Sequence, residues 1–174
     1  MKLNKLLIVY ILYFLFTGCS IYSFKGSIPS HLNNIAIKKI INETSEYFLS
    51  ESLNNELLDG ILKQNLLSIS SLEKADCTID LKIKRLLDEP ELLNESDTNV
   101  SVKQWKIILD VEVVWYDLVN QKDILNTFVS ETVIYSLVNQ IDNQSIQASS
   151  RQEAIDICLK QITDRILNEL TSTW

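Results

Sequence analysis

The strictest alternation of apolar and polar residues in this chain lies between residues 105 and 115. Every second residue there is apolar: Trp105, Ile107, Leu109, Val111, Val113 and Trp115. This period of two predicts a β-strand with one face on a core, which buries both tryptophans; the alternative is that they are exposed binding aromatics. A shorter alternating run over residues 78–87 predicts a second strand. Residues 124–138 predict a third, joined to residues 105–115 by a polar turn as an antiparallel hairpin.

Two segments instead carry apolar side chains at helical spacing. In the first, which starts at Glu46, the apolar stripe consists of Leu49, Leu53, Leu57 and Ile61. Residues 42–45 precede it as a turn that supplies capping oxygens, and Asn65 ends it because asparagine tolerates the left-handed conformation. In the second, the stripe consists of Ile155, Leu159, Ile162, Ile166 and Leu170. Ser150 and Glu153 form a capping box that starts this helix.

Two shorter apolar runs, residues 34–41 and 66–70, predict further strands, whereas acidic residues and Pro90 predict a loop or hairpin tip over residues 88–102. Each helix has one apolar stripe, so both helices can cover the single apolar face of an antiparallel sheet. The pattern therefore predicts an α+β fold: a two-layer sandwich of two amphipathic helices packed on one face of a mostly antiparallel sheet of about four to five strands. We expect a single domain over residues 34–174.

The N-terminus has the pattern of a secretory signal. Lys2 and Lys5 precede an uncharged run over residues 6–16, which is about half the roughly 20 residues that a membrane-spanning helix needs. Gly18 directly before Cys19 resembles the lipobox of bacterial lipoproteins, with Phe16 at the position of the usual leucine.

The lipobox resemblance implies that residues 1–18 are a signal peptide and that residues 19–33 are a tether. Cys19 would carry a diacylglycerol and an N-acyl chain, and Ser20, in place of a retaining aspartate, implies the outer membrane. The alternative is an ordinary signal peptide cut nearby, which leaves Cys19 as a plain thiol.

Composition narrows the class of partner. The 174 residues carry a net charge of −7, with only three glycines and two prolines, which favours continuous regular structure. An acidic domain is a poor ligand for nucleic acid, whose phosphates bind through lysine and arginine. We expect no nucleic-acid partner.

The sequence offers no catalytic constellation. Its one histidine, His31, lies in the expected tether, where a solvated side chain is the simplest interpretation. No phosphate loop, metal-ligand spacing or nucleophile elbow is present. We therefore predict no catalytic residue, no metal, no cofactor besides the lipid on Cys19, and no enzymatic activity. Cys77 and Cys158 either form a disulfide in an oxidising periplasm or stay as buried free thiols.

Basic residues gather on two of the predicted strands and at their ends. They are Lys82, Lys84, Arg85, Lys103 and Lys106. On the polar face of a sheet they could contact phosphate groups; the alternative is a mixed-charge solvent face, since Asp80, Asp110 and Glu112 share the region. Trp174, at the C-terminus, is a candidate anchor to a partner or to the lipid interface.

Four stretches, taken in order, resemble the LptE-type lipopolysaccharide-assembly lipoproteins. They are Tyr22 to Ser27 with Pro29, His31 and the strand at Ile35; Asn42 with Thr44; Glu73 to Asp76, Glu89–Pro90 and Asn99–Val100; and Glu153 to Ile155 with the terminal tryptophan. Asn65, Thr98 and Thr173 stand where the family usually has glycine. The resemblance covers essentially the whole chain after Cys19, and none of its motifs is catalytic.

This resemblance implies a lipid-anchored outer-membrane lipoprotein on the periplasmic side. It would plug and help assemble the LptD-type β-barrel translocon and assist lipopolysaccharide delivery to the outer leaflet. The five basic residues then become candidate lipopolysaccharide headgroup contacts. Two alternatives stay open. One is an accessory lipoprotein that activates a peptidoglycan synthase or seeds a secretion channel; the other is a periplasmic hydrolase, which would need a cleft with convergent polar groups.

Overall fold

The computed structural model describes residues 28–91, 104–136 and 147–172. Cys19, Lys103 and Trp174, all named from the sequence, lie outside these ranges. The elements in chain order are β1 (Asn34–Ile37), β2 (Ile41–Asn42), α2 (Leu49–Gln64), β3 (Ser68–Ile69), a 3-10 helix η1 (Leu72–Lys74), β4 (Cys77–Glu91), β5 (Gln104–Asp117), β6 (Lys122–Tyr135) and α3 (Arg151–Ser172).

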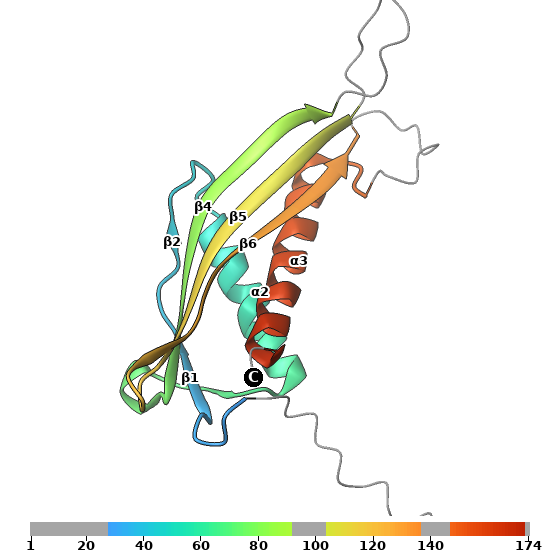
Figure 1. Ribbon diagram of the computed structural model, residues 1–174. Coiled ribbons are helices and arrows are strands. Elements are labelled where there is room, and N and C mark those ends of the chain that lie inside the picture. The colour runs from blue at the N-terminus through green and yellow to red at the C-terminus, as the bar shows by residue number, and fades with distance from the viewer. Residues whose placement is uncertain (1–27, 92–103, 137–146, 173–174) are drawn as a thin grey trace, which may run out of the picture.

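The described strands form one mixed sheet of six, in the order β3-β1-β4-β5-β6, with β2 also paired to β4. The long pairs β4–β5 and β5–β6 are antiparallel, and the short pairs of β1 and β2 with β4 are parallel. Both helices cover one face of this sheet (Figure 1). The predicted two-layer α+β fold is thus confirmed. The strand count rises to six because the apolar run over residues 34–41 divides into β1 and β2 and both ends pair with β4.

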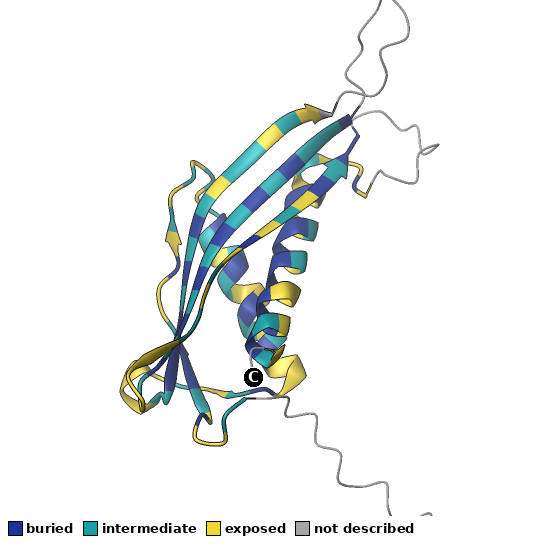
Figure 2. Ribbon diagram, viewed as in Figure 1, coloured by how far each residue is buried: buried dark blue, intermediate teal, exposed yellow. Residues whose placement is uncertain are grey.

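The hydrophobic core lies between the sheet and the helices, and burial follows the two periods of the sequence (Figure 2). Trp115 is fully buried on β5, together with the other odd-numbered apolar residues from Ile107 onward. Trp105 is half-buried and packs against the same core. The apolar stripes of α2 and α3, which begin at Leu49 and Ile155, pack against these sheet residues from the helix layer.

Strand β4 is longer than predicted. Residues Asp88 to Glu91 extend it by pairing with β5, opposite Ile107 to Gln104, where the charge and Pro90 had suggested a loop. The register shifts between Ile83 and Arg85, so Lys84 is an extra residue that forms a β-bulge. Beyond the bulge, Leu86 lies opposite the buried Leu109 and Asp88 opposite Ile107, so both face the helix layer.

The predicted helix ends are mostly confirmed. Asn65 ends α2 in the left-handed conformation, with φ 50° and ψ 41°. At the start of α3, the Glu153 backbone N–H donates to Ser150 Oγ at 3.2 Å. The Glu153 carboxylate, however, accepts from the N–H and hydroxyl of Ser149 at 2.8 and 2.6 Å, one residue before the predicted partner. Helix α2 begins at Leu49 and not at Glu46, because the side chains of Asn42 and Thr44 organise a turn there.

Part of the expected tether belongs to the folded unit. Leu32 is buried in the core and Ile28 packs against it, so the apolar content of this segment overrides its Ser and Pro residues.

Cys77 and Cys158 are buried free thiols. Burial raises their pKa to about 11 and about 12 respectively.

Candidate functional site

The candidate site is the outer face of the sheet, defined as the face of β4, β5 and β6 that points away from the helices. On this face Lys82 lies opposite Glu112, Arg85 opposite Asp110 and Glu89 opposite Lys106. Strands β4 and β5 are adjacent and antiparallel, so basic and acidic residues alternate across them.

The structure brings Lys82, Lys84 and Arg85 together and pairs each with a carboxylate. Lys84 Nζ lies 2.8 Å from Glu43 Oε2, and Lys82 Nζ lies 3.9 Å from Glu43 and 4.0 Å from Glu112. The hydrogen bond from Lys84 lowers the pKa of Glu43 and raises that of Lys84. Because these groups are exposed to solvent, such ion pairs are weak and another anion can compete for the lysines.

The Arg85 guanidinium makes the tightest pair of this cluster. Its Nε and Nη2 lie 2.7 and 2.6 Å from Asp110 Oδ2. The other oxygen, Oδ1, accepts from the Ser130 hydroxyl at 2.6 Å, which ties β4, β5 and β6 together. Since its carboxylate partner is also held by Ser130, Arg85 is the least available of the three cations.

Lys106 stands apart from this cluster. It pairs with Glu89 at 3.7 Å, four positions along β5 from Asp110, the partner of Arg85, and six from Glu112. At about 3.3 Å per strand residue, these positions lie roughly 13 Å and roughly 20 Å from Lys106. The structure therefore does not join Lys106 to Lys82, Lys84 and Arg85 in one site.

A second polar cluster links the helix starts to the sheet, and the sequence analysis missed it. Arg151 donates to Asp88 Oδ2 at 2.7 Å and to Glu46 Oε1 at 2.8 Å, and the Tyr135 hydroxyl donates to Asp88 Oδ1 at 2.9 Å. Burial, followed by the hydrogen bond to Asp88, raises the pKa of Tyr135 to about 12. Only the bulge at Lys84 turns Asp88 to the helix side, and residue spacing alone does not reveal that bulge.

A third cluster holds the N-terminal segment at the opposite end of the sheet. Asp117, which is fully buried, accepts from His31 Nε2 and from Asn120 Nδ2, both at 2.8 Å. Burial raises the pKa of Asp117, but hydrogen bonds from the Asn120 backbone, His31 and the Asn120 side chain lower it to about 2 overall. His31, 37% exposed, is thus not a freely solvated side chain as expected, because the segment around it folds back on β5.

Asp76, which lies next to β4, also holds the N-terminal segment by accepting hydrogen bonds from its backbone. Its Oδ2 accepts from the backbone N–H groups of Asn33 and Asn34 at 2.9 and 2.8 Å. These two hydrogen bonds lower the pKa of Asp76. We call His31, Asp76, Asp117 and Asn120 the N-terminal clasp. Its bonds hold the chain up to the start of β1, and Asp117 Oδ1 also accepts from the backbone N–H groups of Val119 and Asn120 in the turn between β5 and β6.

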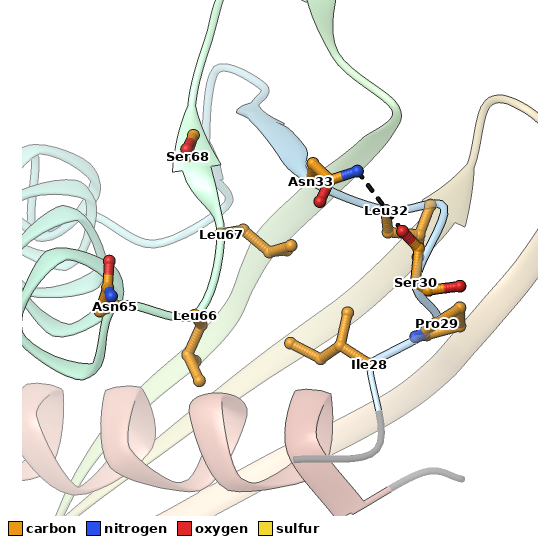
Figure 3. A pocket seen from close by; sticks show the side chains of 9 residues that line it. All are labelled: Ile28, Pro29, Ser30, Leu32, Asn33, Asn65, Leu66, Leu67 and Ser68. Atoms are coloured by element: carbon orange, nitrogen blue, oxygen red, sulfur yellow. Dashed lines mark hydrogen bonds between the residues drawn. The ribbon is translucent and has the colours of Figure 1, made fainter. Parts of the chain in front are cut away.

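A cavity of about 270 Å³ lies beside the clasp, between the N-terminal segment and the chain after α2. Ile28 and Leu66 lie on opposite sides of it, with Leu32, Leu67 and Asn65 nearby (Figure 3). None of its lining side chains is titratable, so it offers no acid or base. Within the described ranges, no cluster of three or more His, Cys, Asp or Glu residues could hold a metal ion.

Comparison with known proteins decides the family. The model of the LptE lipopolysaccharide-assembly family matches residues 32–170, which span both layers of the fold. The chain belongs to the LptE family. This is a non-catalytic lipoprotein family. Membership confirms both the predicted family and the prediction that the protein has no enzymatic activity. No curated protein matches the chain.

Solved structures share the fold of this LptE-family chain at low sequence identity. A hypothetical protein from Chlamydia trachomatis aligns with a TM-score of 0.56 at 11% identity, over 82% of this chain and 97% of its own. Lipoprotein B from Nitrosomonas europaea gives 0.55 at 14%, over 83% and 84%. Rare lipoprotein B from Shewanella oneidensis gives 0.54 at 15%, over 81% and 96%. None of the helices described for this chain is long and apolar enough to cross a membrane.

Proposed function

We propose that this LptE-family protein is an outer-membrane lipoprotein, anchored on the periplasmic side through lipid on Cys19. It plugs and helps assemble an LptD-type β-barrel translocon and assists lipopolysaccharide delivery to the outer leaflet. The family match over residues 32–170 carries this proposal, because it includes every described strand, helix α2 and all but the last two residues of helix α3.

The charge arrangement of the outer face supports a position inside a barrel. The lumens of porin-like barrels are polar. On the outer face, Lys82, Lys84, Arg85 and Lys106 each have a carboxylate within 4.0 Å. A surface whose cations are already paired can approach a polar wall without burying an isolated charge, which is the costly arrangement.

The proposed anchor keeps the domain at the membrane. Ile28, which packs against the core, follows Cys19 by nine residues. Fully extended, nine residues reach at most about 30 Å. This short reach raises the effective concentration of the domain near a barrel in the same membrane without any further contact.

The basic cluster provides the candidate contacts for lipopolysaccharide. Lys82 and Lys84 share Glu43, an exposed carboxylate, and phosphate groups can displace it because they offer more charge and more acceptor oxygens. Lys106, Lys103 and Trp174 remain candidates for separate contacts with lipopolysaccharide or with the barrel.

The partner is tested by purifying the tagged full-length protein from detergent-solubilised envelopes and identifying bound proteins by mass. Recovery of a large β-barrel near one-to-one supports the proposal, and a Cys19→Ser variant should recover less of it. Recovery of a peptidoglycan synthase, or of no barrel, overturns the proposed role.

The headgroup contacts need a separate test. Lys82→Glu with Lys84→Glu should weaken binding of purified lipopolysaccharide, whereas the control Lys63→Glu, on α2 in the other layer, should not. Binding that is unchanged by the double substitution rules out these lysines as the contact site and leaves the barrel partnership standing.

A further inference from the structure

Helices α2 and α3 run side by side in the same direction and bring their C-terminal ends to one end of the molecule (Figure 1). Arg151, at the start of α3, donates to Glu46, just before α2. Further along, Gly60 on α2 lies against Leu167 on α3. Because residues 60 and 167 are level, Leu66, which is six residues past Gly60, is level with about residue 173 of the α3 chain.

Trp174 follows Ser172, the last residue of α3, by only two residues. Two residues span at most about 7 Å, to which the long tryptophan side chain adds its own reach. The cavity between the N-terminal segment and the chain after α2 is lined by Leu66. Trp174 therefore belongs to the neighbourhood of this cavity.

The helical phase of α3 predicts a core-facing side chain at residue 174. Ile162, Ile166 and Leu170 follow one another at intervals of four residues, and all three are buried. Trp174 is the next position of that series. Residues four apart share one face of a helix. The direction of the stripe therefore favours an indole on the core side over an indole in solvent.

The cavity suits an indole in size and in chemistry. Its volume is about 270 Å³, roughly nine times the share of one water molecule in the liquid. Ile28 and Leu66 present apolar side chains from opposite sides, and Ser30, Asn33 and Asn65 lie around them (Figure 3). A buried indole N–H usually needs an acceptor, which these polar residues can supply.

We propose that the indole of Trp174 occupies this cavity, between Ile28 and Leu66. It joins the end of α3 to the N-terminal segment, which is then held twice: by the N-terminal clasp at β5 and by the indole at α3. Because Cys19 precedes Ile28 by only nine residues, this contact fixes the point at which that chain leaves the domain. It also replaces the external contacts considered above for Trp174, and it is independent of the proposed role in lipopolysaccharide assembly.

Phe24 is the competing occupant from the same chain. It lies between Cys19 and Ile28, a stretch that has to reach the membrane if Cys19 carries lipid. Trp174 has no such constraint and follows a helix of known phase. The proposal therefore commits to Trp174, and Phe24 or a partner protein becomes an outcome of the test.

Fluorescence of the full-length protein in detergent tests the position of the indole. The difference in emission between the native protein and Trp174→Phe isolates Trp174 from Trp105 and Trp115. This emission should be blue-shifted and protected from quenching by iodide. Tyr47→Trp supplies the exposed reference, since Tyr47 is 89% exposed, and its added emission should be red-shifted and readily quenched.

Detergent bound to the lipid could also shield an indole, so a double-mutant cycle in urea unfolding tests the contact itself. Trp174→Ala should lower the urea midpoint of the native protein. In a Leu66→Ala background the same substitution should lower the midpoint less, because the two side chains share one contact. Leu62→Ala is the matched control, because Leu62 lies on the last turn of α2 but is 65% exposed. It should leave the effect of Trp174→Ala unchanged.

Four results would each overturn the proposal. They are an indole at residue 174 that iodide quenches as readily as the reference, a urea midpoint that Trp174→Ala does not change, coupling of Leu66 to Phe24→Ala instead of Trp174→Ala, and a Trp174→Ala variant that loses only a bound barrel. The last result would place the indole on the partner and leave the proposed function standing.

Discussion

Gly60 on α2 lies so close to Leu167 on α3 that a Cβ atom at residue 60 would come within 2.5 Å of Leu167 Cδ1. Glycine inside a helix costs about 1 kcal/mol relative to alanine, yet here it allows the two helices to touch. We predict that Gly60→Ala destabilises the protein by about 1 kcal/mol, because overpacking exceeds the gain in helix propensity. Urea unfolding measures this change.

A double-mutant cycle separates packing from propensity. Leu167→Ala alone should cost about 2–5 kcal/mol, since Leu167 is fully buried. Combined with Gly60→Ala, the loss should be smaller than the sum, because the new methyl group occupies the space that the leucine leaves. Asn55→Ala, at an exposed position of the same helix, serves as the control for propensity and should be neutral or slightly stabilising. Strict additivity would show that Gly60 is not a packing residue.

Asp117 should contribute a stability that disappears in acid. Its folded pKa of about 2 lies below the usual unfolded value of about 3.9. A depressed carboxyl pKa stabilises the folded state above the unfolded pKa, and the contribution falls as the pH drops through the folded value. We predict that Asp117→Asn costs about 1–2 kcal/mol at pH 6. The difference from the native protein should shrink steadily between pH 4 and about pH 2.

Urea unfolding at several pH values measures that difference. Asp59→Asn, which removes an exposed carboxylate from α2, is the control for a general change in charge. A difference between the native protein and Asp117→Asn that stays constant down to about pH 2 would show that the clasp does not hold an ionised Asp117.

Arg151 should matter more to stability than other surface arginines. It joins the start of α3 to Asp88 on β4 and to Glu46 before α2. We predict that Arg151→Met costs about 1–2 kcal/mol, because two charge-assisted hydrogen bonds are lost and two carboxylates are left close together. Arg165→Met removes a more exposed pair with Glu131 and should cost no more than about 1 kcal/mol. Equal losses in urea unfolding would argue against a special role of Arg151.

The parts of the fold that could be predicted are those set by local periodicity. From Ile107 onward, strand β5 buries every second residue, so its alternation identifies both the strand and its core face. The stripes of α2 and α3 identify their buried faces in the same way. Asn65 was predictable because a left-handed residue at a helix end is a local requirement. Residues 88–91 were not predicted, because their strand conformation depends on hydrogen bonds to β5 and not on their own preference.

The clusters between elements could be predicted only in part. Lys82, Lys84 and Arg85 are neighbours in sequence, so a shared face was expected, but their carboxylate partners depend on register. His31 and Asp117 are 86 residues apart and meet only because the N-terminal segment folds back on β5. Asp88 reaches Arg151 only because of the bulge at Lys84. Spacing along one segment does not encode such contacts.

Cys77 and Cys158 should be unreactive in the folded protein. Both are fully buried free thiols, and burial raises their pKa to about 11 and about 12, so almost no thiolate is present at neutral pH. We predict that a thiol-specific reagent modifies neither one in native buffer, in oxidising or reducing conditions alike. Both should react once urea unfolds the chain, at a rate that follows global unfolding. A Cys77→Ser, Cys158→Ser variant gives the background reading, including any signal from Cys19. Rapid labelling of either thiol without urea would show that the core opens locally, between β1 and β4 for Cys77 or beneath α3 for Cys158.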